Sequence, residues 1–188
     1  VMHGAIEFYQ NAKANGINPI IGCELYLTQN MHERKLLADG SQSNHQVTLA
    51  TNEAGYHNLL RLSSAAHLQG FYYKPRVDLD MLNEHSEGLI GTSSCLKGQI
   101  PECIVRGESK EAMELAGRYE DIFGKGNFYL ELQDHGIEEQ KIANRGLIEL
   151  ASKTGLPLIA SNDVHYLKHE HWEAHEVMLC LQTGTTIT

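Results

Sequence analysis

The chain alternates between two patterns of hydrophobic residues, which together predict an order of strands and helices. Short apolar runs bounded by turn residues are typical of buried strands, whereas apolar residues spaced three or four apart are typical of amphipathic helices. Strands are predicted at residues 18–27, 45–50, 89–92, 128–132 and 157–161. Helices are predicted at residues 4–15, 53–68, 79–85, 98–105, 110–123, 138–153 and 169–181, with a polar loop at 28–44.

This order of elements indicates an α/β fold. Strands that alternate with helices form parallel β-α units, and right-handed crossovers arrange such units in an open sheet or a barrel. Five strands are too few for an eight-stranded barrel, which takes roughly 250 residues. We therefore expect most of a barrel or a small doubly wound sheet, in a chain as long as one domain or a large piece of one.

Composition and charge exclude several classes of protein. Hydrophobic residues make up 41% of the chain, too many for a disordered protein. The formal net charge of -9 excludes the general nucleic-acid binding that clustered Lys and Arg provide. No apolar stretch approaches the roughly 20 residues of a membrane helix, so no membrane partner is expected. Because the four cysteines lie scattered, we expect a reducing compartment, the cytoplasm, and no disulfide framework.

The eleven histidines raise the hypothesis of a metal site, because histidine is the commonest metal ligand. Most of them fall in predicted helices or loops, where we interpret them as solvated. These are His3, His32, His57, His67, His85, His135, His169, His171 and His175. His135 follows the end of a predicted strand and could face a substrate. His45 opens a strand and, taken alone, has no evident role.

Glu24 is a carboxylate within an otherwise apolar predicted strand. A buried carboxylate must be paired, protonated or bound to a metal, because burial without a partner costs several kcal/mol. The alternative is that strand alternation turns Glu24 toward solvent. Cys95 follows another apolar strand, where a free thiol is usually an inert core residue.

Asp163 and His165 follow the strand predicted at 157–161. In α/β barrels the active site is built at the carboxyl ends of the strands. Two residues that are two apart in an extended segment project to the same side, so this pair could share a metal. The alternative is that Asp163 caps the next helix and His165 is a surface residue. Because Glu24 and Cys95 also lie at the carboxyl ends of predicted strands, the four positions together favour a mixed-ligand transition-metal site.

Lys74 and Arg76 are the best local candidates for contacting a phosphate group. They lie in a segment that also holds three aromatic residues and a proline. A solvated loop is the alternative interpretation.

Several segments resemble the PHP (polymerase and histidinol phosphatase) domain, in the version at the N-terminus of bacterial DNA polymerase III alpha subunits. The resemblance covers residues 1–188, a single partial domain, and implies a distorted seven-stranded β/α barrel. It rests on residues Gly4–Tyr9, Pro19–Glu24, Gly55–Leu59, Gly70–Arg76, Phe128–Leu132 and Asn162–His165.

The resemblance implies a cluster of up to three metal ions held by nine ligands at the strand ends. The ions are expected to be zinc, with manganese or magnesium as alternatives. Five ligand positions carry over to this chain, and they give His45 a role: Glu24, His45, Cys95, Asp163 and His165. The resemblance implies that Glu24, Asp163 and His165 are also catalytic.

The other four ligands of the family have no counterpart in this sequence. The family begins with a His-x-His strand, and Val1–Gly4 resembles the stretch after its later Thr-Asp-His-Gly motif. We therefore expect a chain truncated at both ends, with an incomplete metal cluster, in which His3 is no ligand.

The resemblance implies that the parent protein is a DNA-directed DNA polymerase whose PHP domain can act as a 3′→5′ proofreading exonuclease. The implied partners are DNA and other replisome subunits, and the chain by itself is expected to be inactive. Two alternatives stay open. One is a stand-alone PHP phosphoesterase acting on a small phosphate such as histidinol phosphate, and the other is a structural, metal-bearing scaffold within the polymerase.

Overall fold

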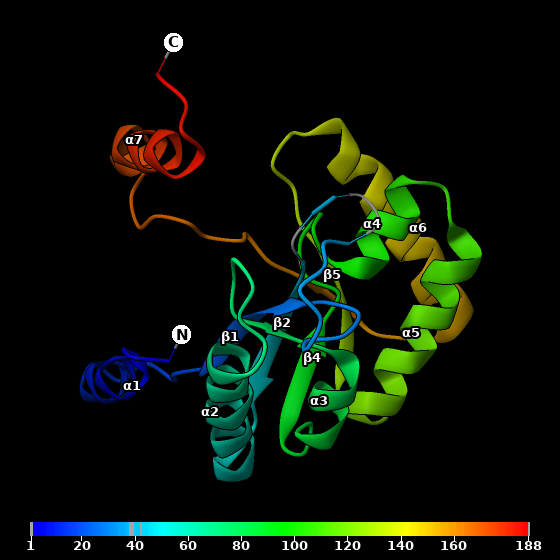
Figure 1. The fold of residues 1–188 in the computed structure, drawn as a ribbon, viewed down its shortest axis with the longest axis horizontal. Helices are drawn as coiled ribbons and strands as arrows, with labels where there is room; N and C mark the ends of the chain where they lie inside the picture. The colour runs from blue at the N-terminus through cyan, green and yellow to red at the C-terminus, as the bar shows by residue number, and fades with distance from the viewer. Residues whose placement is uncertain (1, 38–39, 42, 188) are drawn as a thin grey trace.

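A computed structural model describes residues 2–37, 40–41 and 43–187, so parts of the predicted loop at 28–44 and both end residues of 1–188 lie outside it. The described chain is an α/β structure with a mixed six-stranded sheet in the order β3-β1-β2-β4-β5-β6 (Figure 1). The strands are β1 (Gly22–Leu27), β2 (Asn44–Ala50), β3 (Arg76–Val77), β4 (Leu89–Thr92), β5 (Phe128–Leu132) and β6 (Leu158–Ala160).

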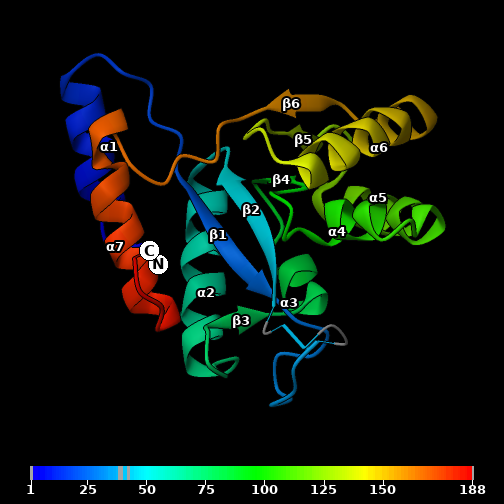
Figure 2. The ribbon, with the colours of Figure 1, turned by 90° about the horizontal axis from the view of Figure 1, so that it is seen from above.

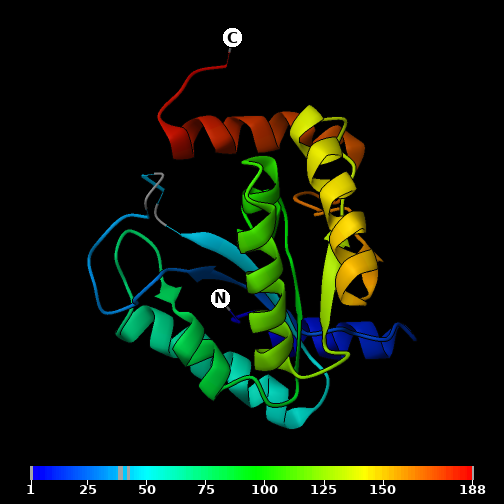
Figure 3. The same cartoon turned by 90° about the vertical axis from the view of Figure 1, so that its right-hand side faces the viewer.

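Seven α-helices accompany the sheet in the described residues, and each predicted helix is present. They are α1 (Ala5–Ala14), α2 (Glu53–Leu68), α3 (Leu79–Glu84), α4 (Gln99–Val105), α5 (Ser109–Phe123), α6 (Glu138–Thr154) and α7 (Trp172–Thr183), the last preceded by a 3-10 turn at His169–His171. Figure 3 looks onto α5 and α6, with α2 and α3 below the strands. The two-residue strand β3 is too short for a hydrophobic pattern to reveal it.

The predicted parallel β-α units form only part of the sheet, which is mixed. β2 runs antiparallel to both of its neighbours, β1 and β4, whereas β1–β3, β4–β5 and β5–β6 are parallel. Antiparallel neighbours need no crossover helix, and the described residues between β1 and β2 form none. As a consequence, the amino end of β2 lies at the same edge as the carboxyl ends of β1 and β4, with Leu27 opposite Asn44.

The hydrophobic core lies between the helices and one face of the sheet. Leu25 and Leu27 of β1 belong to it, as strand alternation predicts. The ring of Phe128 on β5 stacks on Tyr119 of α5 at 4.8 Å between centroids. Opposite Phe128, β4 carries Gly91, where a Cβ atom would lie 2.3 Å from the ring of Phe123. The missing side chain therefore lets the aromatic cluster pack directly on the strand.

The other face of the sheet is polar and partly open, and β1 shows the change of face most clearly. Its burial alternates along the strand, so that Glu24 and Tyr26 face away from the core while Cys23 and Leu25 are buried. Tyr26 lies opposite His45 of β2 in the strand register. This face therefore collects the side chains that the sequence marked as chemically active.

The helices α1 and α7 stand away from the core (Figure 2). Ala12 is the buried residue of α1, and α7 has none. Large apolar side chains of α7 are exposed: Trp172, Val177, Met178, Leu179 and Leu181. Among the described residues, none of the helices has the length and apolar character to cross a membrane.

We expect the substitution Gly55→Ala to destabilise the protein, because α2 begins in backbone contact with Gly88. A Cβ atom at Gly55 would lie 1.9 Å from the carbonyl oxygen of Gly88. Overpacking of this kind costs about 1–3 kcal/mol. The matched control is Gly117→Ala in α5, where open space surrounds the new methyl group and helix propensity predicts a gain of roughly 0.5–1 kcal/mol. Urea unfolding of both variants measures the difference, and equal stabilities would contradict this packing.

Candidate metal centre

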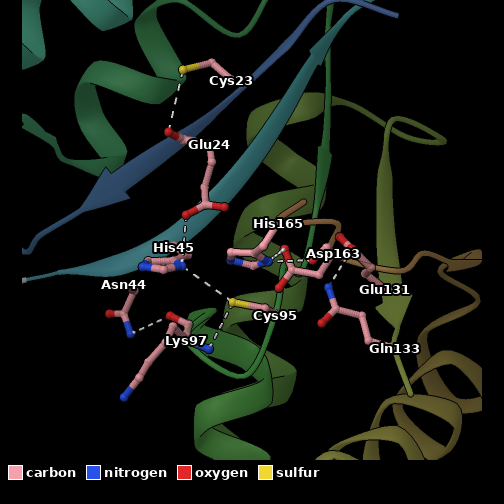
Figure 4. Close-up of polar contacts among 10 residues, drawn as sticks. All are labelled: Cys23, Glu24, Asn44, His45, Cys95, Lys97, Glu131, Gln133, Asp163 and His165. Atoms are coloured by element: carbon pink, nitrogen blue, oxygen red, sulfur yellow. Dashed lines mark hydrogen bonds and ion pairs between the residues drawn. The ribbon is translucent and has the colours of Figure 1, made fainter. Parts of the chain in front are cut away.

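Glu24, His45 and Cys95 meet at the edge of the sheet where β2 begins. His45 Nδ1 lies 3.0 Å from Glu24 Oε1 and 3.5 Å from Cys95 Sγ (Figure 4). The backbone holds this arrangement, because the N–H of His45 donates to the carbonyl of Lys97, two residues after Cys95. Three segments far apart in the sequence thus place an oxygen, a nitrogen and a sulfur donor side by side.

Glu24 and His45 each stabilise the charged form of the other. The pKa of His45 is raised to about 9 because Cys95 and Glu24 both accept from its protonated ring, which outweighs the effect of burial. The pKa of Glu24 is lowered, chiefly by its hydrogen bond to His45 and further by the charge of His165 and Lys74. The proton on His45 faces the Glu24 carboxylate and the Cys95 sulfur, two groups of the kind that bind a cation when they act as ligands.

Asp163 and His165 follow β6 and point toward the same region (Figure 4). Asp163 Oδ1 lies 3.9 Å from His165 Nδ1, and the His165 ring contacts the carbonyl oxygen of Asp163 at 2.7 Å. The two side chains come together through a turn and not through an extended segment, because Asp163 has φ +44°. Asp163 caps no helix, since the next helical turn begins at His169.

The five donors suit a transition metal. Carboxylate oxygen, imidazole nitrogen and thiolate sulfur are the ligand types of zinc and related ions, and they come here from four segments of the chain. Backbone conformation is unusual at the same place: Ser94, beside Cys95, has φ +64°. Non-glycine residues with positive φ are uncommon and cluster at active sites.

A second group of possible ligands lies close together, but its charges do not favour a metal ion. Cys103, Glu108 and Glu111 have ligand atoms that all lie within 4.8 Å of one another. However, the guanidinium of Arg106 already supplies the positive charge there, with Nε 2.7 Å from Glu108 Oε2. Burial raises the pKa of the Cys103 thiol to about 11, which disfavours the thiolate that binds metals. We therefore assign this group to an ion pair around Arg106.

The candidate phosphate contacts differ in their surroundings. Lys74 Nζ lies 4.4 Å from the ring centroid of Tyr26, close to the Glu24–His45 pair. Arg76 is 1% exposed, and its guanidinium donates to the carbonyls of Glu33 and Lys35 and to other groups. This burial rules out a phosphate contact and makes Arg76 a structural residue, a correction to the sequence-based prediction. His135 is exposed, beyond the end of β5.

Glu131 is the main residue at this site that the sequence analysis overlooked. It is 7% exposed and accepts hydrogen bonds from Thr92 of β4, from Ser161 after β6, and from Gln133 at 2.9 Å. The donors Thr92 and Ser161 precede Cys95 and Asp163 by three and two residues. Glu131 therefore connects the strand ends that carry these two candidate ligands. Like Glu24, it is a carboxylate within an apolar strand, which is the signal that could have identified it.

His175 of α7 is a second overlooked residue. Its ring lies 5.7 Å from that of His165 in an edge-on arrangement, and 5.3 Å from the ring of Tyr166. In the described residues, this contact brings α7 to the margin of the candidate centre. Its position in a helix of mixed composition gave no signal in the sequence.

Comparisons with known proteins show the family of the chain. A sequence model of the PHP domain matches residues 1–135. The DNA polymerase III subunit alpha of Treponema pallidum is 46% identical over 183 residues, which are 97% of this chain and 16% of that protein. The subunit of Borreliella burgdorferi is 45% identical over 97% of this chain and 16% of its own length. That of Thermus aquaticus is 42% identical, over 99% and 15%. The chain spans about a sixth of the length of these curated relatives.

We expect Glu131→Leu to lower the free energy of unfolding, because it leaves the buried donors Thr92 and Gln133 and the half-buried Ser161 without their acceptor. The cost of an unpaired buried group is roughly 1–3 kcal/mol. Glu131→Gln is the matched control, since its side chain keeps a carbonyl acceptor and the neighbouring hydroxyls can rotate to accept. Chemical denaturation compares the two, and a Leu variant as stable as the Gln variant would argue against the network.

Proposed function

The chain belongs to the PHP domain family, and we propose that it is the metal-binding PHP segment of a DNA polymerase III alpha subunit. Identity of 42% to 46% across nearly the whole chain to proteins of that name supports the proposal. On this basis the parent protein carries out DNA-directed DNA synthesis. Its partners are DNA and the other replisome subunits, and it works in the cytoplasm, where bacteria replicate their DNA.

We propose that residues 1–188 form part of a distorted seven-stranded β/α barrel whose interior is the polar face of the sheet. The half-exposed face that carries Glu24, Tyr26 and His45 supports this assignment, because a barrel would enclose it. Ile159 of β6, 40% exposed, also lies in the row of residues facing that side, opposite Glu131. Further strands would cover these residues.

The gathering of Glu24, His45, Cys95, Asp163 and His165 at one edge of the sheet carries the functional proposal. We assign the five residues to a divalent metal cluster, with zinc the favoured ion because the set includes a thiol and two imidazoles. Bound divalent cations polarise a phosphoryl oxygen and promote the ionisation of water, which is the chemistry of phosphodiester hydrolysis.

The chain's own residues would divide the work of a 3′→5′ exonuclease. Glu24 and Asp163 supply the negative charge that binds cations, while His45, Cys95 and His165 complete the donor set. The Glu131 network holds the strand ends of Cys95 and Asp163 in position. A stand-alone phosphoesterase receives less support, because the named relatives are all several times longer than this chain.

We expect the metal content of the whole protein to depend on this site. Glu24→Gln and Asp163→Asn should each weaken zinc binding by at least about tenfold, the effect that even outer-shell changes produce at metal sites. Glu111→Gln, in the group around Arg106, is the matched control and should leave zinc binding unchanged. Equilibrium dialysis with elemental analysis measures the zinc bound by all three variants. If the Glu111 variant lost zinc and the Glu24 variant retained it, the zinc site would have to be assigned to the group around Arg106 instead.

We expect Asp163→Asn to reduce metal-dependent release of nucleotides from a primer 3′ end by about 100-fold or more, as when other catalytic groups are removed. Asp121→Asn, on the exposed side of α5, is the control. Gel analysis of labelled primers gives the rate, and the melting temperature reports folding. A wild-type protein that trims no primer, with an Asp163 variant that fails to fold, would favour the structural scaffold.

A further inference from the structure

The loop between α2 and β3 presents aromatic side chains beside the candidate metal centre. Figure 1 shows this segment as a narrow loop that extends past the end of α2. Phe71 is 56% exposed and Tyr73 is 66% exposed. Tyr73 lies at the tip with φ +59°, between Tyr72 and Lys74, whose backbones form a bridge. A bulky residue held in this conformation and exposed to solvent needs an explanation, because the conformation is strained.

Short contacts connect the tip of the loop to the centre. Lys74 Nζ lies 4.4 Å from the centroid of the Tyr26 ring. The Tyr26 ring in turn lies 5.4 Å from the ring of His45, edge to face. Tyr26 and Glu24 are two apart on β1 and share its polar face. The ammonium group of Lys74 therefore lies on the same side of the sheet as the Glu24–His45 pair.

The base of the loop is fixed, so the aromatic tip is already in place before any ligand binds. Arg76 Nε donates to the carbonyl of Gly70 at 3.2 Å, and the guanidinium lies 5.1 Å from the ring of Tyr72. At Gly70 a Cβ atom would lie 1.9 Å from the carbonyl oxygen of Arg76, so the two ends of the loop meet in direct backbone contact. A preorganised binding surface loses little conformational entropy when its ligand arrives.

We propose that the loop Phe71–Lys74 binds the last nucleotide of a single-stranded nucleic-acid end, with Tyr73 stacked on the base and Lys74 beside the phosphate. Exposed rings and an adjacent cation form the combination that holds single-stranded nucleic acid. One lysine and a net charge of -9 match a single terminal nucleotide and not the backbone of a duplex. The proposal rests on the proposed function, since it assigns the substrate end that the metal centre would cleave.

Photo-crosslinking tests the contact without requiring hydrolysis. The whole protein is irradiated, in the presence of a metal chelator, with a short single-stranded oligodeoxynucleotide whose 3′-terminal base is iodouracil. We expect mass spectrometry to find the crosslink in residues 71–74. It should persist in Tyr9→Ala, which removes another exposed aromatic beside a lysine, on α1. A crosslink outside residues 71–74, or none, would overturn the proposal.

Three variants test the separate roles of the ring and the charge. Tyr73→Asn should lower the affinity for a single-stranded 3′ end by roughly 5- to 150-fold, the effect of losing one stacked base. Asparagine is chosen because it tolerates the positive φ. Tyr73→Phe, which keeps the aromatic ring, should leave this affinity unchanged. Lys74→Gln should reduce the slope of log affinity against log salt by about 0.7, the contribution of one phosphate contact. Unchanged affinity in Tyr73→Asn and an unchanged salt slope in Lys74→Gln would overturn the assignment.

These measurements distinguish nucleic-acid binding by the loop from metal-dependent hydrolysis at the candidate centre. Metal-dependent primer trimming with no crosslink to the loop would overturn this inference and leave the proposed function standing. A crosslink to the loop, lost in Tyr73→Asn, in a protein that trims no primer would support the inference and contradict the nuclease role. Binding of double-stranded ends in preference to single-stranded ends would also overturn the inference.

Discussion

Antiparallel pairing of β2 with both of its neighbours is the constraint on which the candidate centre depends. Because β2 runs against β1 and β4, its first residues lie at the edge where those strands end. His45 therefore stands between Glu24 and Cys95 and contacts both. With β2 parallel to its neighbours, the same side chain would lie at the opposite edge of the sheet.

Electrostatics give the centre its character once the strands are paired. The imidazole of His45 holds a proton between a carboxylate and a thiol, and the pKa values of His45 and Glu24 shift in opposite directions because each stabilises the charged form of the other. Donors arranged in this way attract a cation in place of the proton. The ion pair of Arg106 with Glu108 illustrates the contrast, because a fixed guanidinium already satisfies the acidic groups there.

Buried charged residues on both sides of the centre hold the neighbouring chain segments in place. Glu131 links the ends of β4, β5 and β6 on one side, and Arg76 closes the base of the aromatic loop on the other. Both are charged side chains inside the fold whose hydrogen bonds are made mostly to groups from other segments, so their role is to fix geometry. Three non-glycine residues with positive φ lie in the loop or next to candidate ligands: Tyr73, Ser94 and Asp163.

The sequence by itself determined where the helices and most strands lie, because hydrophobic periodicity is a local property of the chain. It also indicated Glu24, Cys95, Asp163 and His165 as polar residues at the carboxyl ends of apolar strands, and the resemblance to a family added His45. Only the tertiary structure decided the direction of β2, the burial of Arg76 and the roles of Glu131 and His175. Strand direction and burial depend on which distant segments pair. A local pattern of polar and apolar residues does not determine that pairing.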